Sequence, residues 1–479
     1  MVGSFFRVSS RALLLLSLHA LMIRFMHEGY TYGAKGKIAS YTVSLSSLLP
    51  SPSCSPSTTK ASNQKSTLEL IHKHGPCSQL VQDPHPLNHT KILLQDESRV
   101  RWIQFQSSNS SHVLKASAAA HLRAKSDITV GTGNYLVTIG LGTPKKDLTL
   151  IFDTGSPLTW TRCKPCVGSC YTQSDPIFNP SHSSPYDNIS CTSTSCSHLG
   201  SIGISRCSGS TCLYSIQYGD NSSSVGFFAT EKLTISPTEV IDNFEFGCSE
   251  NNQGLFGRAA GLIGLSDDNI SIVEQTADKY GKYFSYCLPS STSSTGHPTF
   301  GKEGGAPSSV SFTPLSRVQQ SSQFYGISIV GISVEGNLLS IPSMVFSNGG
   351  TIIDSEPVIT RLPPTVYRAL RTAFRKAMAN YTRAPTVSLF DTCYDFSKES
   401  TVAIPSIMFS FAGGVDLDLD PSRIFYVVKA LQVCLAFAAN GADSDPVIYV
   451  NAQQKTFEAV YDVAGGKRGF GSNGCSRDA

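Results

Sequence analysis

Two apolar runs that each end in an acidic residue organise the larger part of this chain. Residues 135–142 alternate β-branched and small side chains as a strand does, and residues 148–152 form a second apolar run that leads into Asp153. In the second half, residues 351–353 form a short apolar run that leads into Asp354. Each aspartate therefore follows a predicted strand and begins a turn of small residues.

The same order of features occurs twice, which indicates a weak internal duplication. About a hundred residues after each aspartate comes a further apolar stretch, at residues 260–264 and 447–451. The pattern predicts two similar lobes that each offer one carboxylate. Helical spacing is scarce and is strongest over residues 364–381, where two prolines suit the first helical positions. We therefore expect a mostly β fold with few short helices.

The first residues have the pattern of a secretory signal. Arg7 and Arg11 precede an apolar run over residues 12–23, and no acidic residue occurs before that run. The run is shorter than the roughly 20 apolar residues that span a bilayer, although a signal anchor is an alternative. We expect a signal peptide or anchor at residues 1–28, and no stable membrane association of the mature chain.

Residues 29–130 are expected to form a pro-segment. The region is rich in serine, and residues 91–105 have the apolar and charged spacing of a helix. A flexible extension without a function is the alternative. The mature part then divides into an N-terminal lobe, residues 131–318, and a C-terminal lobe, residues 319–479.

Composition excludes some classes of protein. Charged residues make up only 15% of the chain, against roughly 25% in an average soluble protein, while 40% of residues are hydrophobic. This combination excludes a disordered acidic protein. The net charge of +3 is too small for an electrostatic nucleic-acid binder, so we expect no nucleic-acid partner.

Cysteines and glycosylation sequons favour the secretory pathway, with an extracellular (apoplast) or vacuolar destination. Twelve of the 14 cysteines lie after residue 130, as in a disulfide framework. The alternative, a zinc knuckle at Cys163, Cys166 and Cys170, has no histidine or second cysteine pair nearby, so we predict no metal and no other cofactor. The sequons are at Asn88, Asn109, Asn188, Asn221, Asn269 and Asn380.

Two aspartates at turns are suited to acid–base chemistry if the lobes bring them together. Two neighbouring carboxylates cannot both ionise cheaply, so the pair shares one proton at acidic pH. The ionised member can deprotonate a water while the protonated member donates to a substrate carbonyl. Asp153-Thr154-Gly155-Ser156 after an apolar strand, with Asp354-Ser355 after another, is a strong signal for this chemistry in a cysteine-rich chain.

These motifs resemble the pepsin-like aspartic proteases, and in particular their plant nepenthesin-like branch. The resemblance covers residues 131–479 and also rests on Tyr218-Gly219-Asp220, residues 260–265 and residues 453–462. It implies a bilobed pepsin-like fold with an active-site cleft between two β-rich lobes. It also implies an endopeptidase that cleaves peptide or protein substrates at acidic pH, acts as a monomer and is made as a zymogen.

The resemblance also implies roles for individual residues. Asp153 and Asp354 would be the catalytic pair, supported by Thr154, Gly155, Ser156 and Ser355, and Tyr218 and Gly219 would lie in a flap over the substrate, with Trp160 behind it or simply in the core. The disulfides that it implies are Cys163–Cys166, Cys170–Cys248, Cys191–Cys212, Cys196–Cys207, Cys287–Cys475 and Cys393–Cys434.

The second turn departs from the family pattern, because Glu356 and Pro357 stand where glycine and a hydroxyl residue are usual. A glutamate there is expected to strain the turn and to bring a third negative charge near the pair. Pro357 lacks both an N–H and a hydroxyl that could donate to Asp354. The alternative function is therefore a catalytically weakened or inactive homologue that acts as a secreted protein-binding or inhibitor-like protein.

Overall fold

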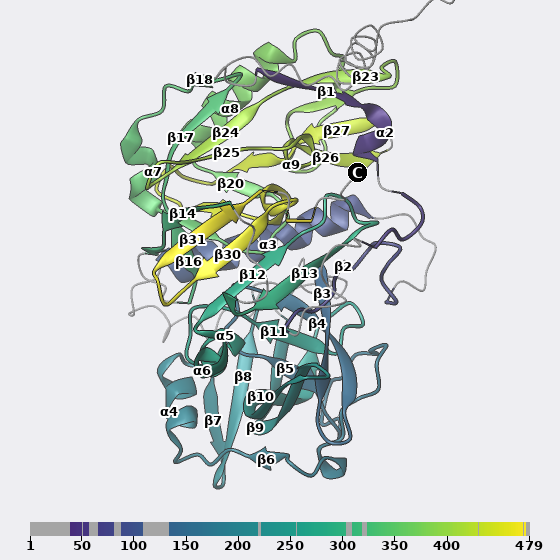
Figure 1. Cartoon of the computed structure of the whole chain (residues 1–479), viewed down its shortest axis with the longest axis vertical. Helices are drawn as coiled ribbons and strands as arrows, with labels where there is room; N and C mark the ends of the chain where they lie inside the picture. The colour runs from purple at the N-terminus through teal and green to yellow at the C-terminus, as the bar shows by residue number, and fades with distance from the viewer. Residues whose placement is uncertain are drawn as a thin grey trace, which may run out of the picture.

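Two β-rich lobes, with a helix packed between them, make up the molecule (Figure 1). The computed structural model describes residues 39–49, 51–56, 66–80, 88–108, 134–218, 222–254, 256–302, 309–318, 323–429, 431–472 and 474–475. The predicted signal segment, Asn109, Gly219 and Asn221 lie outside these residues. The strands dominate the described chain, so the predicted mostly β, bilobed class is confirmed.

A sheet of fifteen described strands forms the N-terminal lobe and extends into the middle of the molecule. Its lobe portion contains β3 (Tyr135–Leu141), β4 (Lys146–Asp153), β5 (Trp160–Arg162), β6 (Asp187–Asn188), β7 (Ser205–Ser208), β8 (Thr211–Gln217), β9 (Ser223–Ser236), β10 (Glu239–Gln253) and β11 (Gly261–Gly264). Its middle portion joins strands from both halves of the chain: β12 (Tyr283–Cys287), β13 (Thr295–Phe300), β14 (Val310–Pro314), β30 (Glu458–Asp462) and β31 (Lys467–Gly471).

The segment before residue 131 contributes strands to both lobes. Strand β2 (Leu70–His72) lies between β13 and β3 in the large sheet, and its Leu70 is fully buried. Strand β1 (Ser40–Ser44) pairs with β23 (Thr401–Pro405) of the C-terminal lobe. The disulfide Cys54–Cys77 joins the stretches that follow these two strands.

Three smaller sheets build the C-terminal lobe. One contains β15 (Ser316–Arg317), β16 (Tyr325–Ile327), β19 (Thr351–Ile353), β20 (Thr360–Leu362), β28 (Phe437–Ala439) and β29 (Val447–Tyr449). The second contains β17 (Ile329–Val334), β18 (Asn337–Leu338), β24 (Ile407–Phe411) and β25 (Val415–Asp418). The third contains β21 (Arg383–Ala384), β22 (Cys393–Asp395), β26 (Phe425–Lys429) and β27 (Gln432–Leu435).

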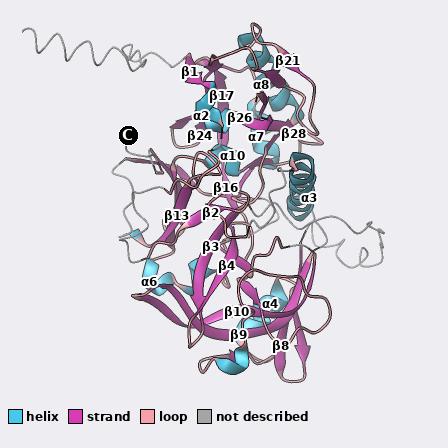
Figure 2. Ribbon diagram, turned by 90° about the vertical axis from the view of Figure 1, so that its right-hand side faces the viewer, coloured by secondary structure: helices cyan, strands magenta, loops and turns pink. Residues whose placement is uncertain are grey.

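Helices are mostly single turns at the margins of the sheets (Figure 2). The described α-helices are α2 (Leu45–Leu48), α3 (His89–Ser108), α4 (Thr194–Ser201), α5 (Ile272–Gln275), α6 (Ala277–Tyr280), α7 (Ser343–Gly349), α8 (Pro364–Ala377), α9 (Pro421–Ile424) and α10 (Asn451–Gln454). Helix α8 begins at the predicted residue and buries Val366, Leu370 and Phe374, which recur every fourth position. It ends four residues before the predicted end.

Parallel strand pairs hold both aspartate turns in the same way. Strand β11 runs parallel to β4, which ends in Asp153, and β29 runs parallel to β19, which leads into Asp354. These strands are the apolar stretches that recur in the sequence. The predicted duplication is therefore visible as two matching strand pairs, one in each lobe.

Two of the six expected disulfides, Cys287–Cys475 and Cys393–Cys434, are present, and the other four are wrong. In place of Cys163–Cys166 and Cys170–Cys248, the bonds are Cys163–Cys248 and Cys166–Cys170. The physical reason is strand pairing: β5 and β10 run side by side, and the Cys163 N–H donates to the Ser249 carbonyl at 2.7 Å, which brings Cys163 next to Cys248.

The other correction concerns four cysteines near α4. In place of Cys191–Cys212 and Cys196–Cys207, the bonds are Cys191–Cys207 and Cys196–Cys212. Cys207 and Cys212 are cross-strand neighbours on β7 and β8, so both face the remaining two cysteines. The pairing follows depth, because Cys196 and Cys212 are buried while Cys191 and Cys207 lie further out.

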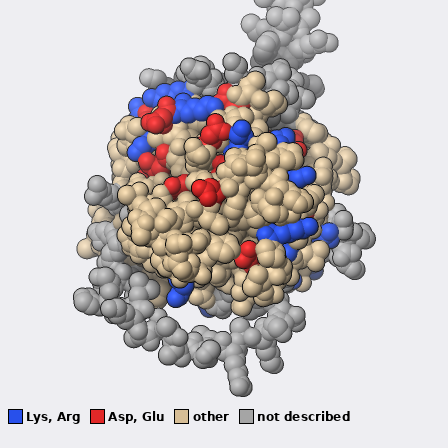
Figure 3. All heavy atoms as spheres, turned by 90° about the horizontal axis from the view of Figure 1, so that it is seen from below, with Lys and Arg blue, Asp and Glu red and all other residues tan. Residues whose placement is uncertain are grey.

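Surface charge is sparse and mixed. On the face shown in Figure 3, acidic and basic side chains are interspersed among large uncharged areas. This distribution agrees with the low charged fraction of the sequence and gives that face no single-sign patch for nucleic acid. In the described part of the chain, no helix combines the length and the hydropathy that a membrane crossing requires.

Candidate active site

Asp153 and Asp354 both lie fully buried, one in each lobe, at the start of their turns. The carbonyl of Asp153 accepts a hydrogen bond from the N–H of Leu265, just after β11, at 2.9 Å. The N–H of Asp354 donates to the carbonyl of Tyr449 in β29 at 3.1 Å. The strand pair in each lobe therefore fixes the backbone of its own aspartate.

Thr154 and Ser355 link the two turns across the lobe boundary. The Thr154 N–H donates to the Ser355 Oγ at 3.1 Å, and the Ser355 N–H donates to the Thr154 Oγ1 at 2.9 Å. The two hydroxyls are also 3.2 Å apart. Because each hydroxyl accepts the N–H of the other lobe and both residues are buried, the turns have a fixed mutual position.

Backbone N–H groups donate to both carboxylates. The Gly155 N–H lies 2.7 Å from Asp153 Oδ1, and the Glu356 N–H lies 3.1 Å from Asp354 Oδ1. A Cβ on Gly155 would come within 2.7 Å of Asp354 Oδ2, so this close approach requires glycine. The two turns thus supply equivalent backbone donors although only the first contains glycine.

Side-chain donors, in contrast, are unequal in the two turns. The Ser156 hydroxyl donates to Asp153 Oδ2 over a very short distance. Pro357, the residue at the equivalent position of the second turn, has no hydroxyl and no N–H. Asp153 therefore accepts from a side chain of its own turn, whereas Asp354 instead accepts a longer bond, 3.4 Å, from the Thr154 hydroxyl of the other turn.

Glu356 fits into the second turn without the backbone strain that we expected. Its φ is not among the positive values found in this structure. The side-chain amide of Asn451 donates to the Glu356 carbonyl at 3.1 Å, and the Asn451 N–H donates to the Pro357 carbonyl at 3.2 Å. Asn451, at the start of α10, therefore supports the altered turn.

Helix α3 covers the site and inserts Arg99 between the aspartates. The Arg99 Nη2 lies 3.3 Å from Asp153 Oδ2 and 3.3 Å from Asp354 Oδ2. The Arg99 Nε lies 2.6 Å from the Glu356 Oε2, and its guanidinium stacks on Trp102 with 4.7 Å to the ring centroid. Burial acts to lower the pKa of Arg99, but Glu356, Asp153 and Asp354 together raise it, so Arg99 is a permanent cation here.

The rest of the buried face of α3 is bound to the C-terminal lobe. Asp96 forms an ion pair with Arg361 at 2.7 Å, and both side chains are buried. Leu93 and Ile103 are fully buried at opposite ends of the same face, in separate apolar clusters with residues from position 318 onwards. Asn88 caps the helix, because its side-chain oxygen accepts from the Lys91 N–H at 3.0 Å.

Burial of the pair has an electrostatic consequence. Burial raises the pKa of Asp354 to about 6; the Arg99 cation acts against this rise, and Asp153 adds to it. Burial therefore favours the protonated form of Asp354. Because the groups interact closely, the titration belongs to the pair.

Tyr218 stands at the end of the hairpin formed by β8 and β9. Its hydroxyl accepts a hydrogen bond from the Trp160 Nε1 at 2.7 Å, and its ring contacts Phe256 edge to face with centroids 6.2 Å apart. Burial raises the pKa of Tyr218 well above its ordinary value, so the phenol stays neutral. Trp160 is fully buried behind Tyr218.

The functional residues that the sequence did not indicate all belong to the contact between α3 and the two lobes. Arg99, Asp96 and Arg361 lie in no recognisable motif. One signal was available: Glu356 beside a pair of aspartates needs a cation, and the predicted helix over residues 91–105 contains Arg99 and Arg101. The remaining predicted sequons within the described chain, Asn88, Asn188, Asn269 and Asn380, are exposed.

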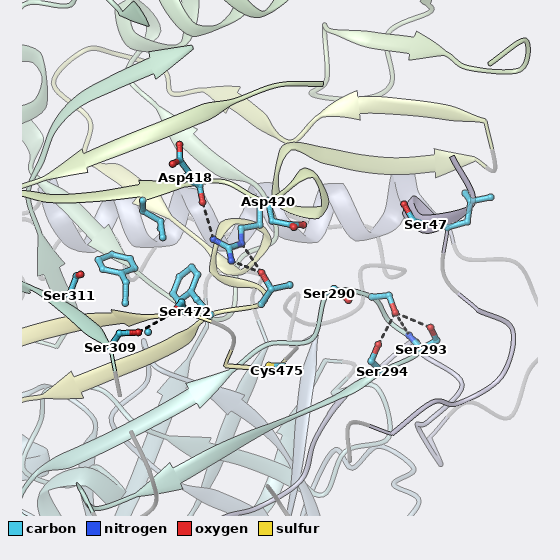
Figure 4. A pocket seen from close by; sticks show the side chains of 18 of the residues that line it. Ser47, Ser290, Ser293, Ser294, Ser309, Ser311, Asp418, Asp420, Ser472 and Cys475 are labelled. Carbon is cyan, nitrogen blue, oxygen red and sulfur yellow. Dashed lines mark hydrogen bonds between the residues drawn. The ribbon is translucent and has the colours of Figure 1, made fainter. Parts of the chain in front are cut away.

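Other hollows and clusters lie away from the aspartates. A cavity of about 770 Å³ is lined by many serines together with Asp418, Asp420 and Arg423 (Figure 4). None of the residues of the two aspartate turns lines it. The sulfurs of Cys191, Cys196 and Cys207 lie within 4.8 Å of one another, but each is in a disulfide and cannot act as a thiolate ligand.

Two family models match the lobes. The model described as "Xylanase inhibitor N-terminal" matches residues 135–302, and the model described as "Xylanase inhibitor C-terminal" matches residues 324–472. Among solved structures, the basic 7S globulin from soybean matches with a TM-score of 0.58 and 21% identity, over 73% of this chain and 94% of that one. At this identity the likeness shows the fold alone.

Relatives with sequence similarity carry protease names. An aspartyl protease family protein of Arabidopsis thaliana is 50% identical over 470 residues, which cover 96% of this chain and 99% of the relative. The aspartic proteinase nepenthesin-2 of Nepenthes gracilis is 36% identical over 349 residues, which cover 70% of this chain and 76% of that relative.

Proposed function

This chain belongs to the plant pepsin-like family of aspartic proteases, and from that membership we propose that it is an aspartic endopeptidase made in a latent form. One observation carries the proposal: two buried carboxylates, Asp153 and Asp354, both contact the same nitrogen, Arg99 Nη2. The turns that hold these carboxylates are also hydrogen-bonded to each other. Where that nitrogen lies, a water molecule could be held by both aspartates.

In the proposed mechanism the two aspartates have different roles. Asp153, with donors from Gly155 and Ser156, is the ionised member that takes a proton from the attacking water. Asp354, whose pKa burial raises to about 6, is the protonated member that donates to the substrate carbonyl. Attack then forms a C–O bond and a tetrahedral intermediate with two hydroxyl groups. Asp153 passes its proton to the amide nitrogen, the C–N bond breaks, and Asp354 takes a proton back from one of the hydroxyls as the carboxylic acid product forms.

Latency follows from the position of α3. The Arg99 guanidinium occupies the space between the carboxylates and pairs with both of them, so neither substrate nor water can use the pair. Activity therefore requires that α3 leave, and cleavage between residues 108 and 134 would separate it from the mature lobes. Acidification would promote this step by protonating the carboxylates that hold Arg99.

Substrate and location are further parts of the proposal. The site suits a peptide or protein substrate, acted on by a monomer with no metal or organic cofactor. The basic and apolar start of the sequence, the sequons and the disulfides support a route through the secretory pathway to the cell exterior or the vacuole.

The decisive experiment uses the purified full chain. On acidification we expect self-cleavage before residue 134 and hydrolysis of a fluorogenic peptide that pepstatin blocks. The Asp153→Asn variant should lack both activities, and the Asp242→Asn variant, which alters a surface aspartate, should retain them. Hydrolysis that survives Asp153→Asn would exclude the proposed pair.

A binding function without turnover is the second candidate, and Glu356 and Pro357 favour it. The names of the matched family models point to inhibitors of xylanases. Under this alternative the wild-type chain shows no hydrolysis after acidification, and a double variant, Glu356→Gly with Pro357→Thr, acquires it. Failure of the double variant as well would place the loss of activity outside this turn.

A further inference from the structure

A mostly apolar cavity of about 440 Å³ lies where three parts of the chain meet. Leu48 and Leu49, at the end of α2, line it together with Ile92 of α3 and with Phe425 and Val428 of β26. Figure 1 shows α2 beside β26, at the edge of the C-terminal lobe. Small-molecule sites have volumes of roughly 300–1,000 Å³ and apolar walls with a few polar groups. The size and the lining of this cavity therefore suit a small apolar ligand.

Lys455 brings a positive charge to this apolar wall. It follows α10 directly and lines the cavity. Burial lowers its pKa to about 8, although Asp420 acts to raise it, so the ammonium is charged at neutral and acidic pH. Among the described residues no carboxylate forms an ion pair with it, and the Oδ1 of Asp420 instead accepts from the N–H and the hydroxyl of Ser422. A cation in such surroundings is stabilised by an anionic partner.

His72 offers a hydrogen-bond donor near this lysine. Both side chains line the cavity, and Lys455 is among the groups that lower the pKa of His72, after burial and His74. The ring is therefore neutral and carries one N–H. Its Nδ1 accepts from the backbone N–H of His74 at 3.2 Å, which assigns the ring hydrogen to Nε2. The cavity thus combines one ammonium and one neutral N–H donor with an apolar lining.

The other ionisable groups on the wall add no negative charge. None of the described residues that line the cavity is an aspartate or a glutamate. The Nδ1 of His89 and the Tyr426 hydroxyl are partners at 2.9 Å, and burial, then Lys73 and His89, lower the pKa of His74 to about 4. Lys429 is exposed, so water screens its charge. The wall as a whole is therefore positive and centred on Lys455.

We propose that this cavity binds an aliphatic monocarboxylate, a molecule with one carboxylate and a long apolar chain. The carboxylate accepts hydrogen bonds from the Lys455 ammonium and the His72 Nε2–H, and such charge-assisted bonds are stronger than neutral ones. The chain lies against the leucines of α2 and the apolar side chains of β26, where its burial adds to the affinity. An alcohol of the same length lacks the charge that completes this match.

A bound carboxylate also has an effect on latency, because the walls of the cavity come from both sides of the proposed cleavage region. Leu48, His72 and Ile92 lie before that region, whereas Phe425 and Lys455 belong to the C-terminal lobe. A ligand that binds only the assembled site stabilises it, and at about a hundred times its Kd it shifts the equilibrium about a hundredfold towards the docked form. This effect rests on the proposed latent protease, whereas the binding itself does not.

The test is calorimetric titration of the uncleaved full chain near neutral pH with decanoate and with decanol, both below the concentrations at which they aggregate. We expect decanoate to bind about tenfold to a hundredfold more tightly than decanol, the range given by a hydrogen bond between charged groups. Lys455→Met should remove this difference by weakening decanoate alone, and Lys455→Arg, which keeps the cation, should retain most of it. Lys398→Met alters an exposed lysine of the same lobe and should bind decanoate as wild type does.

Further outcomes separate the site from the proposed protease function. With decanoate present, the pH at which an added protease begins to cut α3 should be lower in wild type and unchanged in Lys455→Met. Decanoate binding without that shift supports the site and overturns its effect on latency, even if the chain hydrolyses no peptide. Equal affinity for decanoate and decanol, or a decanoate preference that survives in Lys455→Met, overturns the site. A preference lost in Lys429→Met but kept in Lys455→Met overturns it as well.

Discussion

Asp96 of helix α3 and Arg361 of strand β20 form a buried ion pair at 2.7 Å, although 265 positions separate them in the sequence. The other oxygen of Asp96 accepts from the N–H of Val358 at 2.6 Å. Burial raises the pKa of Asp96, while Arg361 and the N–H donors act to lower it. The pair lies beside the altered aspartate turn, so it fixes α3 to the segment that carries Glu356.

Removing Asp96 should release α3 from the cleft. Asp96→Ala leaves Arg361 buried without its main counter-charge, which typically costs about 3–5 kcal/mol. We expect an added protease to cut the chain within α3 faster at neutral pH, and thermal unfolding to begin earlier. Arg101→Ala is the control, because the Arg101 side chain is 75% exposed in its pair with Glu97. It should leave the rate of cutting unchanged and alter the free energy of unfolding by no more than about 0.5 kcal/mol. Equal protease resistance of Asp96→Ala and wild type would contradict the assigned role.

Replacing Arg99 by methionine should open the active site while α3 keeps its apolar contacts. The variant keeps an unbranched, flexible side chain but removes the cation between the carboxylates. Two effects are expected: pepstatin binds the full chain without prior acid activation, and the pKa of Asp354 rises above about 6 because Arg99 no longer lowers it. Arg101→Met is the matched control. Unchanged pepstatin affinity of Arg99→Met would show that the rest of α3 is sufficient to block the site.

Asp354 should make the folded protein less stable as the pH rises from about 4 to about 6. Its pKa is raised in the folded state from 3.8 to about 6, so its favourable contribution is fully present below 3.8 and is lost as the pH passes through 6. A shift of this size corresponds to on the order of 3 kcal/mol. Urea unfolding at a series of pH values should show the slope in wild type and in Asp242→Asn. In Asp354→Asn the slope should diminish, and an undiminished slope would assign it to other groups.

Much of the fold could be predicted from the sequence because its strongest signals are local. Asp153 and Asp354 each follow an apolar run, and the recurring stretches at 260–264 and 447–451 became the strands that support the two turns. Helix α8 could be predicted because its apolar residues, such as Val366 and Leu370, recur at helical spacing. In each case neighbours in sequence carry the information.

The missed features depend on residues that only the fold brings together. Nothing near Arg99 in the sequence indicates that Glu356 will be its partner, since the contact depends on how α3 crosses the lobes. The predicted disulfide pairing near α4 is wrong for a related reason. Cys207 and Cys212 are cross-strand neighbours, and the burial of each cysteine in the fold decides which partner it takes. The sequence alone predicts a third negative charge at Glu356 but not Arg99, the cation that lies against it in the folded chain.

Histidines should make the N-terminal segment release at acidic pH. Burial, then Lys73 and His89, lower the pKa of His74 to about 4, and burial, then His74, Lys455 and Lys73, lower the pKa of His72. Both line a cavity of about 440 Å³ between that segment and the C-terminal lobe. The histidine pKa is lowered only while the segment is docked. Between about pH 4 and 6.5 the released segment therefore binds a proton that the docked segment does not. Docking therefore weakens as the pH falls from 6.5 towards about 4, by up to about 3 kcal/mol for His74, less where water screens it.

The quantity to measure is the pH at which α3 is half released, and its readout is the sensitivity of the full chain to an added protease. His74→Gln cannot titrate, so its midpoint should lie at a lower pH than that of wild type. His182→Gln, an exposed histidine, should leave the midpoint unchanged. Because protonation of the carboxylates that hold Arg99 also promotes release on acidification, the difference between variants, and not the absolute midpoint, isolates the histidine contribution. Identical midpoints in His74→Gln and wild type would leave the carboxylates as the trigger.

Pro357→Ser should restore the donor that the second turn lacks and shift the pH range of activity. In the first turn the Ser156 hydroxyl donates to Asp153, and a serine at 357 would stand at the equivalent position for Asp354. A donor to the ionised form lowers the pKa of Asp354, which burial has raised to about 6, by about one unit. Since the mechanism requires Asp354 protonated, the alkaline limb of the kcat/KM profile should move to lower pH by about the same amount. Pro357→Ala relieves the proline constraint without adding a hydroxyl, so it should leave the limb in place. If both variants shift it equally, the backbone of the turn, and not the missing hydroxyl, sets the titration of the pair.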